Sequence, residues 1–480
     1  METGEDVMKA QKFDWWDFLK KVAVIAVPVA LQNLLTTTGS MVDTMMISSL
    51  GKTEVGAVGL CAQFSSLMFS CYWGFVGGGM LFFSQYWGAK DDDGINRSYG
   101  LTLTCMMTVS FIFFVLALFF PETVMRLYTD KEAIQQIGVE YLRIAAFAYP
   151  LIVFSMAMAS LLRCTERVTI PMYGSFVAVS VNVFLNWVLI FGHLGAPAMG
   201  VRGAALATVI SQGVSAAVII LLAKRNEHPY LLAFRRHFRW TAELIRSYFR
   251  KCFPILMNEI LIGAGNMVIN VVLGRQPEEA IASLAVFRTL EGLIIGFFAG
   301  FSNASSILVG KEVGAGNIDV AYRRAWRLVY LCQGFIGCVG VLLVLLHTPI
   351  LNMMGMSGES FSIAFGMIAI FAVVAFIRMG NWTQNDTFRA AGDASFGTIL
   401  EIVFMWAMLI PCVWLSGMVW KLPTLLVFTF CYIDEPIRYA MMQVHLFRGK
   451  WIKPVTPEGK MALANWKAPG RSGSRAEENN

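Results

Sequence analysis

The sequence predicts an all-α polytopic membrane protein whose twelve transmembrane helices form two pseudo-symmetric six-helix bundles. Its 480 residues are 56% apolar and only 15% charged, and the mean hydropathy is +0.60. Ordinary soluble domains are roughly 45–50% apolar and about 25% charged. Long apolar runs alternate with short polar junctions, and several short motifs recur at one fixed spacing. These three observations carry the prediction.

The apolar content sets the number of helices and disfavours several classes of protein. At roughly 20 residues for each membrane-spanning helix, the apolar residues are enough for about a dozen spans. A soluble enzyme, a disordered scaffold and a secreted disulfide-rich domain are all disfavoured. The nine cysteines lie mostly within apolar runs and lack metal-ligand or redox spacing. We therefore interpret them as small apolar side chains.

Twelve apolar segments can be separated by their polar junctions. Backbone groups in lipid must form their hydrogen bonds within the protein, and segments of this length favour helices over a β-barrel. The N-terminus lacks the basic region and cleavage site of a signal peptide, so the first helix is expected to be retained. The predicted helices are 21–50, 54–86, 98–120, 134–162, 169–192, 200–223, 248–273, 279–310, 322–346, 360–388, 395–418 and 422–447.

The positions of the basic residues predict the direction of these helices. Of the 38 Lys and Arg residues, 28 lie in the two tails and the even-numbered junctions, Arg163 and Arg389 among them, and 6 lie in the odd-numbered junctions. Because basic residues concentrate on the cytoplasmic side, both termini of a multi-pass protein of the plasma membrane are expected in the cytoplasm. The net charge of +6 then follows from topology, and no nucleic-acid partner is expected.

An internal repeat divides the chain into two halves. Four pairs of matching positions are separated by the same 226 residues, which is hard to obtain by chance. Two halves in the same orientation, related by an axis along the membrane normal, are typical of transporters. A duplication kept only for packing is the alternative. The matching positions are Pro28 and Pro254, Gly39 to Val42 and Gly265 to Val268, Gly88-Ala89 and Gly314-Ala315, and Leu162-Arg163 and Phe388-Arg389.

The repeat and the junctions predict five segments. The two halves are an N-lobe that contains the first six helices and a C-lobe that contains the last six. The segments are a cytoplasmic N-terminal stretch at 1–20, the N-lobe at 21–223, a basic cytoplasmic linker at 224–247, the C-lobe at 248–447 and a polar cytoplasmic tail at 448–480.

The sequence contains no motif for the use of ATP. The pattern G-x-x-x-x-G-K-[ST] does not occur, because Gly310-Lys311 is followed by Glu312 and lacks the upstream glycine. The tails and junctions are too short for a nucleotide-binding domain. A transporter of this kind is expected to use an ion gradient, with Na⁺ or H⁺ as the coupling ion and no other cofactor.

Asp43 is the most informative residue of the N-lobe. It lies about 22 residues into the first predicted helix, where a carboxylate costs roughly 2.5–3.5 kcal/mol on insertion scales and needs a partner or a purpose. Asn182 and Asn186 are four residues apart on one face of the fifth helix, and Thr208 lies on the sixth. These four side chains predict either a site for Na⁺ or a carboxylate that binds a proton. A hydrogen-bonded cluster that only fixes helix packing is the alternative.

The C-lobe has a different set of polar residues. Glu259, Arg378, Asn385 and Asp386 are candidates for the lining of a central cavity, as are Gln32 and Asn33 on the first helix. An arginine inside the membrane must be neutralised, and we expect Glu259 or Asp386 to pair with Arg378. Glu435 and Arg438 are three residues apart and are expected to pair on one face. The sequence is consistent both with charges that line the cavity and with structural ion pairs.

Several stretches of the sequence together indicate a known family. They are Pro28 through Asp43 to Gly51, Asn182-Val-Phe-Leu-Asn186-Trp, Gly200-Val-Arg-Gly203 with Ala-Ala-Leu-Ala-Thr208, Phe388-Arg389-Ala-Ala-Gly-Asp393, and Gly449-Lys-Trp451-Ile. With these residues the chain resembles the multidrug and toxic compound extrusion (MATE) transporters over roughly residues 14–455.

The resemblance implies two six-helix lobes that form a V and open alternately to each side of the membrane. It implies the export of amphipathic, cationic organic compounds in exchange for Na⁺ or H⁺, with Asp43, Asn182, Asn186 and Thr208 at the coupling site. Many relatives carry an aspartate at the position of Asn186, which leaves the coupling ion open. Some relatives carry a helix 7 glutamate where this chain has Ile262, and a helix 10 acid where it has Arg378. The roles of those C-lobe acids are therefore not assigned to any residue of this chain.

Two other functions are consistent with this architecture. A flippase for lipid-linked oligosaccharides or peptidoglycan precursors would carry a basic cavity for pyrophosphate. A membrane-embedded lipid-modifying enzyme would gather acids or histidines at the interface, whereas the five histidines are scattered over loops and helix ends. The sequence therefore favours a transporter over an enzyme, with small organic substrates, a lipid bilayer around it and a monomeric state.

Overall fold

The computed structural model describes residues 14–231 and 234–466, and this part of the chain is helical with no β-strand. The predicted tails at 1–20 and 448–480 lie partly outside the described residues. In chain order the α-helices are α1 (Trp15–Ser48), α2 (Lys52–Ala89), α3 (Asp92–Phe119), α4 (Pro121–Tyr128), α5 (Glu132–Ala145), α6 (Ala148–Cys164), α7 (Thr169–Phe191), α8 (Val201–Arg225), α9 (Phe234–His237), α10 (Ala242–Leu273), α11 (Glu278–Gly314), α12 (Ile318–Leu345), α13 (His347–Met353), α14 (Gly358–Ala390), α15 (Phe396–Phe404), α16 (Ile410–Trp414), α17 (Thr424–Phe430), α18 (Glu435–Arg448) and α19 (Pro457–Asn465).

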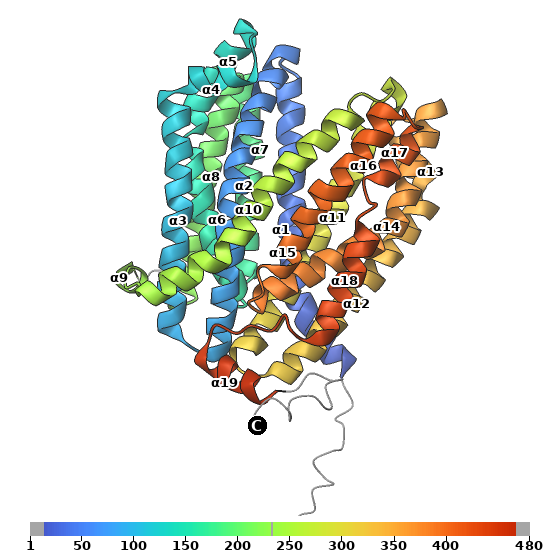
Figure 1. The fold of residues 1–480 in the computed structure, drawn as a ribbon. Helices are drawn as coiled ribbons and strands as arrows, with labels where there is room; N and C mark the ends of the chain where they lie inside the picture. The colour runs from blue at the N-terminus through green and yellow to red at the C-terminus, as the bar shows by residue number, and fades with distance from the viewer. Residues whose placement is uncertain (1–13, 232–233, 467–480) are drawn as a thin grey trace, which may run out of the picture.

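The helices form two bundles that diverge toward one end of the molecule. In Figure 1 the N-terminal half, with α3, α6 and α8, stands apart from the C-terminal half, with α12, α14 and α18. The bundles meet at the end that carries α9 and α19, where α1 also begins. We call this the terminal end and the other the open end. The predicted arrangement of two six-helix lobes in a V is confirmed.

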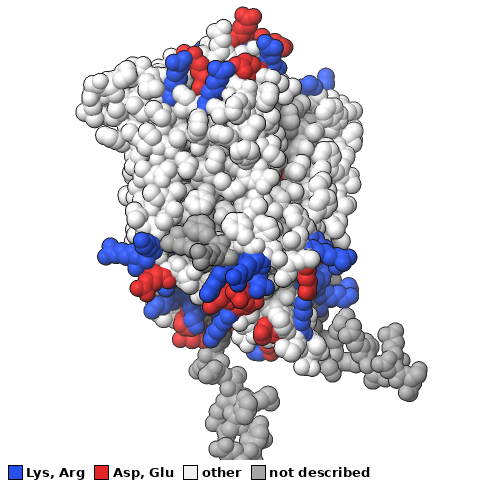
Figure 2. All heavy atoms as spheres, turned by 90° about the vertical axis from the view of Figure 1, so that its left-hand side faces the viewer, with Lys and Arg blue, Asp and Glu red and all other residues white. Residues whose placement is uncertain are grey.

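One face of the molecule has a broad band almost without charged side chains between its two ends. Figure 2 shows Lys, Arg, Asp and Glu gathered in two rims, with a face almost free of them in between. Among the described residues, ten helical segments are long and apolar enough to span a membrane, and α5 with α6 would make an eleventh span. One of the ten is the continuous helical stretch Phe396–Val419, which contains α15, α16 and two π-helical turns. This is the surface that a multi-pass membrane protein presents to lipid.

Prolines break two of the predicted helices. The predicted helix 134–162 is divided into α5 and α6, which are bent by 49°. The predicted helix 422–447 is divided into α17 and α18 around residues 431–434. Pro150 lies four residues after Ala146, and Pro436 lies four residues after Tyr432. A proline ring clashes with the carbonyl of the residue four positions earlier, so a regular helix cannot continue through either break. The spans lie where the sequence predicts them, but these two are not continuous helices.

The internal repeat is visible as a symmetric contact between the lobes at the terminal end. A Cβ atom on Gly88 of α2 would overlap the backbone carbonyl of Lys311 on α11. A Cβ on Gly314 of α11 would overlap the carbonyl of Gln85 on α2. Each residue of one contact lies 226 positions from its counterpart in the other. The two long helices therefore cross backbone to backbone at a pseudo-twofold axis, which only glycine permits.

Polar contacts between the lobes close the terminal end. Lys311 of the C-lobe pairs with Glu166 of the N-lobe at 2.7 Å. Gln85 donates from Nε2 to the carbonyl of Ala390 at 2.8 Å and accepts the N–H of Val455 at 2.7 Å. The chain after α18 thus contacts both lobes, because Thr456 also donates its hydroxyl to the carbonyl of Gly314.

We call residues 449–456, between α18 and α19, the closing segment. Its position is fixed by Asp393, which lies between α14 and α15. Its carboxylate contacts Lys453 at 2.9 Å and His445 at 3.0 Å. Burial alone would raise the pKa of Asp393. The hydrogen bonds from His445 and Lys453 lower this pKa by more than burial raises it, so it lies below the ordinary value. Asp393 is therefore a stable anion that holds the closing segment at the terminal end.

The backbone crossing predicts a strong effect of one added methyl group. We expect Gly314→Ala to lower the stability of the purified protein by about 1–3 kcal/mol, because the Cβ forces α2 and α11 apart. Gly292→Ala on the same helix is the control, since nothing lies within 4 Å of its Cβ position. Thermal unfolding in detergent compares the two variants. Equal melting temperatures would contradict the crossing.

Candidate functional site

A first cavity lies within the N-lobe and has a volume of ≈ 350 Å³. It is enclosed by α1, α5, α6, α7 and α8. Its polar lining includes Gln32 and Asp43 from α1, Asn182 from α7 and Thr208 from α8. The sequence predicted these side chains as site residues, and the structure brings them to one cavity.

Asp43 and its partners form a connected chain of hydrogen bonds. Asn186 donates from Nδ2 to Asp43 Oδ1 at 2.6 Å and to Asn182 Oδ1 at 3.2 Å. Asn182 donates to the hydroxyl of Thr208 at 3.4 Å. Asn186 is fully buried, and its Oδ1 has no partner in the described structure. Asp43, Asn182 and Thr208 thus line the cavity, and Asn186 lies behind them in the same hydrogen-bond chain. One carboxylate and three neutral oxygen-bearing side chains are a donor set that suits a small hard cation or a proton.

A second cavity of ≈ 500 Å³ lies between the two lobes. Asn33 on α1 and Arg163 on α6 contribute from the N-lobe. The C-lobe contributes the predicted residues Glu259, Arg378, Asn385 and Asp386, together with Arg389, Glu401, Glu435 and Arg438. We call it the interlobe cavity. The structure places the charges of the C-lobe along its wall, so they are ion pairs and cavity lining at the same time.

The partner of Arg378 is not the one that the sequence predicted. Arg378 contacts Glu291 of α11 at 2.6 Å and Glu435 of α18 at 3.9 Å. Glu291 also pairs with Arg288 at 2.8 Å and is only 4% exposed. Glu259 or Asp386 as the partner of Arg378 is therefore wrong. α14 turns Arg378 toward α11, whereas Asp386 lies two turns further along toward the terminal end.

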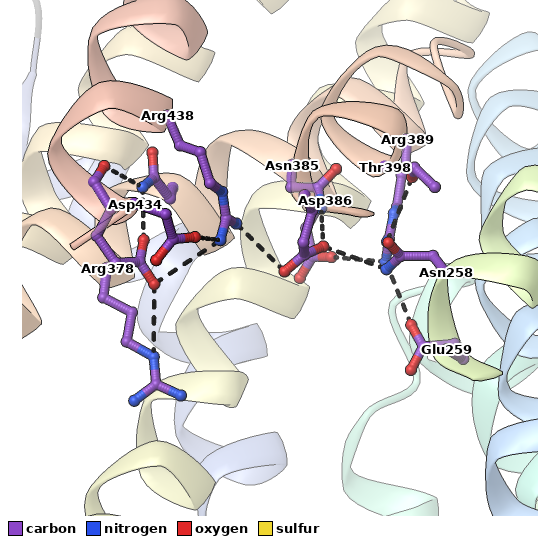
Figure 3. A network of polar contacts seen from close by, with 12 residues as sticks. Asn258, Glu259, Arg378, Asn385, Asp386, Arg389, Thr398, Asp434 and Arg438 are labelled. Atoms are coloured by element: carbon purple, nitrogen blue, oxygen red, sulfur yellow. Dashed lines mark hydrogen bonds and ion pairs between the residues drawn. The ribbon is translucent and has the colours of Figure 1, made fainter. Parts of the chain in front are cut away.

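Glu401 joins the charges of the C-lobe into one line. Its Oε1 contacts Arg438 at 3.2 Å, and its Oε2 accepts hydrogen bonds from Asn258 and Asn385 at 3.2 Å each. Figure 3 shows this line, with Arg438 and Asp434 at one end, Asn385 and Asp386 in the middle and Asn258 beyond them. The predicted pair of Glu435 and Arg438 is present at 3.9 Å, but Asp434 is closer to Arg438, at 3.0 Å.

Arg389 forms the other end of the line. Its guanidinium contacts Glu259 at 3.8 Å and Asp386 at 3.9 Å. In Figure 3 Arg389 and Glu259 lie on the side of Asn258, away from Arg438. Asp386 also accepts a hydrogen bond of 2.6 Å from the hydroxyl of Ser302. Glu259 and Asp386 are thus two carboxylates that share one arginine.

Arg163 occupies the matching place in the N-lobe. It donates from Nη2 to Gln32 Oε1 at 2.8 Å, and Gln32 donates to Ser175 at 2.9 Å. Asn33 beside it donates to the carbonyl of Gly296 on α11 at 3.0 Å. The sequence analysis assigned Arg163 and Arg389 to cytoplasmic junctions between helices. The structure corrects this, because both lie within helices and line the interlobe cavity.

The sequence analysis did not identify Glu401 and Arg163, which line the interlobe cavity. It also did not identify Glu291, which pairs with Arg378 beside that cavity. Glu291 and Glu401 are acids inside long apolar segments, which is itself the signal for a functional or paired charge. The one sequence signal for Arg163 was that Arg389 occupies the matching position of the internal repeat. Among the described residues no group of three or more His, Cys, Asp or Glu side chains could hold a metal ion. In their described linings, the N-lobe cavity has one charged side chain, Asp43, and the interlobe cavity has four arginines and four acids.

The two halves of the sequence both match one family model. The model described as MatE matches residues 28–188 and again residues 254–415, so each lobe carries one copy. The chain belongs to the MATE family. Members of this family are transporters and not enzymes.

Curated MATE relatives align over nearly the whole chain. A probable multidrug resistance protein of Bacillus subtilis, YoeA, is 26% identical over 448 residues, covering 92% of this chain and 95% of its own. The multidrug export protein MepA of Staphylococcus haemolyticus is 22% identical, covering 85% and 91%. The MATE assignment thus extends over both lobes.

Solved structures confirm the MATE fold. A crystal structure of MATE in complex with MaL6 matches with a TM-score of 0.81 at 16% identity, covering 93% of this chain and 96% of that one. An outward-facing multidrug resistance MATE transporter matches with a TM-score of 0.80 at 17% identity, covering 90% and 96%. At this level of identity the likeness shows the fold alone.

The shared carboxylate of Glu291 predicts a large stability effect. We expect Glu291→Gln to destabilise the protein by about 3–5 kcal/mol, because it leaves Arg288 and Arg378 without their closest partner. Glu122→Gln is the control, since it breaks an equally short pair with Arg143 whose side chains are about half exposed. Thermal unfolding measures both variants. An equal loss in both would mean that burial does not matter at Glu291.

Proposed function

We propose that this MATE protein is a secondary active exporter of small amphipathic organic compounds, in exchange for Na⁺ or H⁺. The observation that carries the proposal is Asp43, a carboxylate inside a membrane span that lines the N-lobe cavity and has only neutral hydrogen-bond partners. A carboxylate in this position can alternate between an organic cation and a coupling ion. Relatives described as multidrug resistance proteins support export as the direction.

Coupling follows from competition for Asp43. When ionised, Asp43 attracts a cation; when it binds H⁺ or Na⁺, it loses this attraction and releases the substrate. Asn182, Asn186 and Thr208 would complete a Na⁺ site with their oxygens. Occupancy changes the conformation only if the coupling ion and the substrate differ in affinity between the two lobe arrangements.

The orientation in the membrane is part of the proposal. From the distribution of basic residues we infer that the terminal end, where α1 begins and α19 lies, faces the cytoplasm and that the protein is held in the plasma membrane. The lobes meet at that end and diverge at the other (Figure 1), which corresponds to an outward-facing state. The transporting unit in this proposal is a monomer.

A flippase for pyrophosphate-linked lipids is the second candidate. The observation that favours it is the set of four arginines along the interlobe cavity. Three of them, Arg378, Arg389 and Arg438, each contact carboxylates within 4 Å. A pyrophosphate would have to compete with these carboxylates, so the observed cavity suits an exporter better than a flippase. A lipid-modifying enzyme has no support from the site.

Reconstituted vesicles test the proposed exchange. We expect an imposed Na⁺ or H⁺ gradient to drive uptake of a fluorescent organic cation at least tenfold faster than in vesicles without protein. Each ion is imposed alone, so that the response also identifies the coupling ion. If neither gradient drives uptake but a fluorescent lipid-linked pyrophosphate crosses the bilayer, the flippase function replaces the exporter.

The role of Asp43 is tested by Asp43→Asn. We expect efflux of organic cations to fall at least tenfold, while expression and thermal stability stay near those of the unmodified protein, because an amide can still accept the hydrogen bond from Asn186. Asp130→Asn, an exposed acid between α4 and α5, is the control and should retain efflux. Full drug resistance in cells that express Asp43→Asn would exclude the coupling role.

A further inference from the structure

The interlobe cavity has two walls of opposite charge. Arg163 is the one charged side chain that the N-lobe contributes to its described lining. The C-lobe contributes the arginines Arg378, Arg389 and Arg438 and the acids Glu259, Asp386, Glu401 and Glu435. At ordinary ionisation the N-lobe wall therefore carries one positive charge and the C-lobe wall one net negative charge. Such a cavity is dipolar rather than acidic.

Arg163 differs from the other arginines of the cavity because it has no carboxylate partner. Its one hydrogen bond to a described side chain goes to the neutral amide of Gln32, and its Nε has no partner there. The residue is 5% exposed. A buried guanidinium without a counter-charge is unfavourable, whereas the others contact carboxylates within 4 Å.

The internal repeat shows that this difference is a property of the N-lobe. Arg163 and Arg389 are separated by the 226 residues of the repeat, and the hydrogen bond from Gln32 to Ser175 corresponds to that from Asn258 to Glu401. The scaffold around the two arginines is therefore the same. The acids around Arg389 have neutral counterparts around Arg163: Asn33 in place of Glu259, Ser160 in place of Asp386, and Ser175 in place of Glu401.

We propose that the interlobe cavity binds zwitterionic amphiphiles, with the substrate's carboxylate on Arg163 and its ammonium group facing the carboxylates of the C-lobe. The inference rests on the proposed function and names a substrate class for it. The guanidinium of Arg163 is oriented by Gln32 and lines the cavity, and its planar set of N–H donors fits a carboxylate. The carboxylate supplies the counter-charge that the N-lobe lacks.

The alternative is a purely structural role for Arg163. It stands in the last turn of α6, where the helix dipole favours a cation. A structural arginine would affect all ligands of the cavity to the same degree. A ligand site would distinguish between two compounds that differ only in the carboxylate.

The test measures binding of Nε-dansyl-lysine, a fluorescent zwitterion, and of its methyl ester, which keeps the ammonium group but lacks the carboxylate. We expect the unmodified protein to bind the zwitterion about ten- to hundredfold more tightly than the ester, the usual range for a charged hydrogen bond. In Arg163→Gln this ratio of affinities should fall to near one. Arg167→Gln, which removes an exposed arginine just beyond α6, should keep the ratio.

A second variant guards against misfolding. Gln32→Glu places a carboxylate against Arg163 without removing any charge from the helix, and it should also abolish the ratio. The inference is overturned if the unmodified protein does not bind the zwitterion, if it binds both compounds equally, or if the ratio persists in either variant.

Binding and transport are measured in separate experiments, so that failure of the binding site can be distinguished from failure of the proposed function. A binding preference without transport driven by either gradient would keep the site and reject the exchange mechanism. Gradient-driven export of simple cations without the preference would do the reverse.

Discussion

A charge inside the bilayer is costly unless an opposite charge lies within reach, and the C-lobe of this MATE transporter is organised by that requirement. Helices in lipid gain little from apolar contact with one another, since lipid tails are equally apolar. The ion pairs of Arg378, Arg389 and Arg438 connect α10, α11, α14, α15 and α18 in one line. They therefore fix how the C-lobe helices are rotated, and they bring the polar atoms that line the interlobe cavity to their places.

The N-lobe uses the same scaffold with a different electrostatic character. Both lobes carry the arginine of the repeat, and the helices meet at glycines that occupy matching positions. Around Arg389 the chain has acids, and around Arg163 it has amides and hydroxyls. The acid of the N-lobe is instead Asp43, in a separate cavity. One duplication has thus produced a C-lobe whose cavity arginines are paired with acids, and an N-lobe whose described cavity linings contain one cation, Arg163, and one anion, Asp43, in separate places.

Composition, periodicity and spacing could predict the spans, their division into two halves and the polar cluster of the N-lobe, because these depend on local rules, whereas the V arrangement came from the family resemblance. Asn182 and Asn186 share a helix face by their spacing of four, and a single carboxylate in an apolar helix needs partners. The partner of Arg378 could not be predicted in this way, because it depends on the rotation of α14 against α11. The break before α6 was readable from Pro150, whose ring is incompatible with a continuous helix. Glu291 could be flagged from sequence but not paired.

The two cavities are linked through α1. Near the middle of this helix Gln32 contacts Arg163 and Asn33 donates to Gly296 of the C-lobe, and one to three turns further along Thr36 lines both cavities and Asp43 binds Asn186. In the proposed exchange, a cation that displaced Asn186 from Asp43 would act on the same helix that contacts the C-lobe at Asn33. Under this proposal, occupancy of the N-lobe cavity would bias the lobe arrangement that shapes the interlobe cavity through α1 itself.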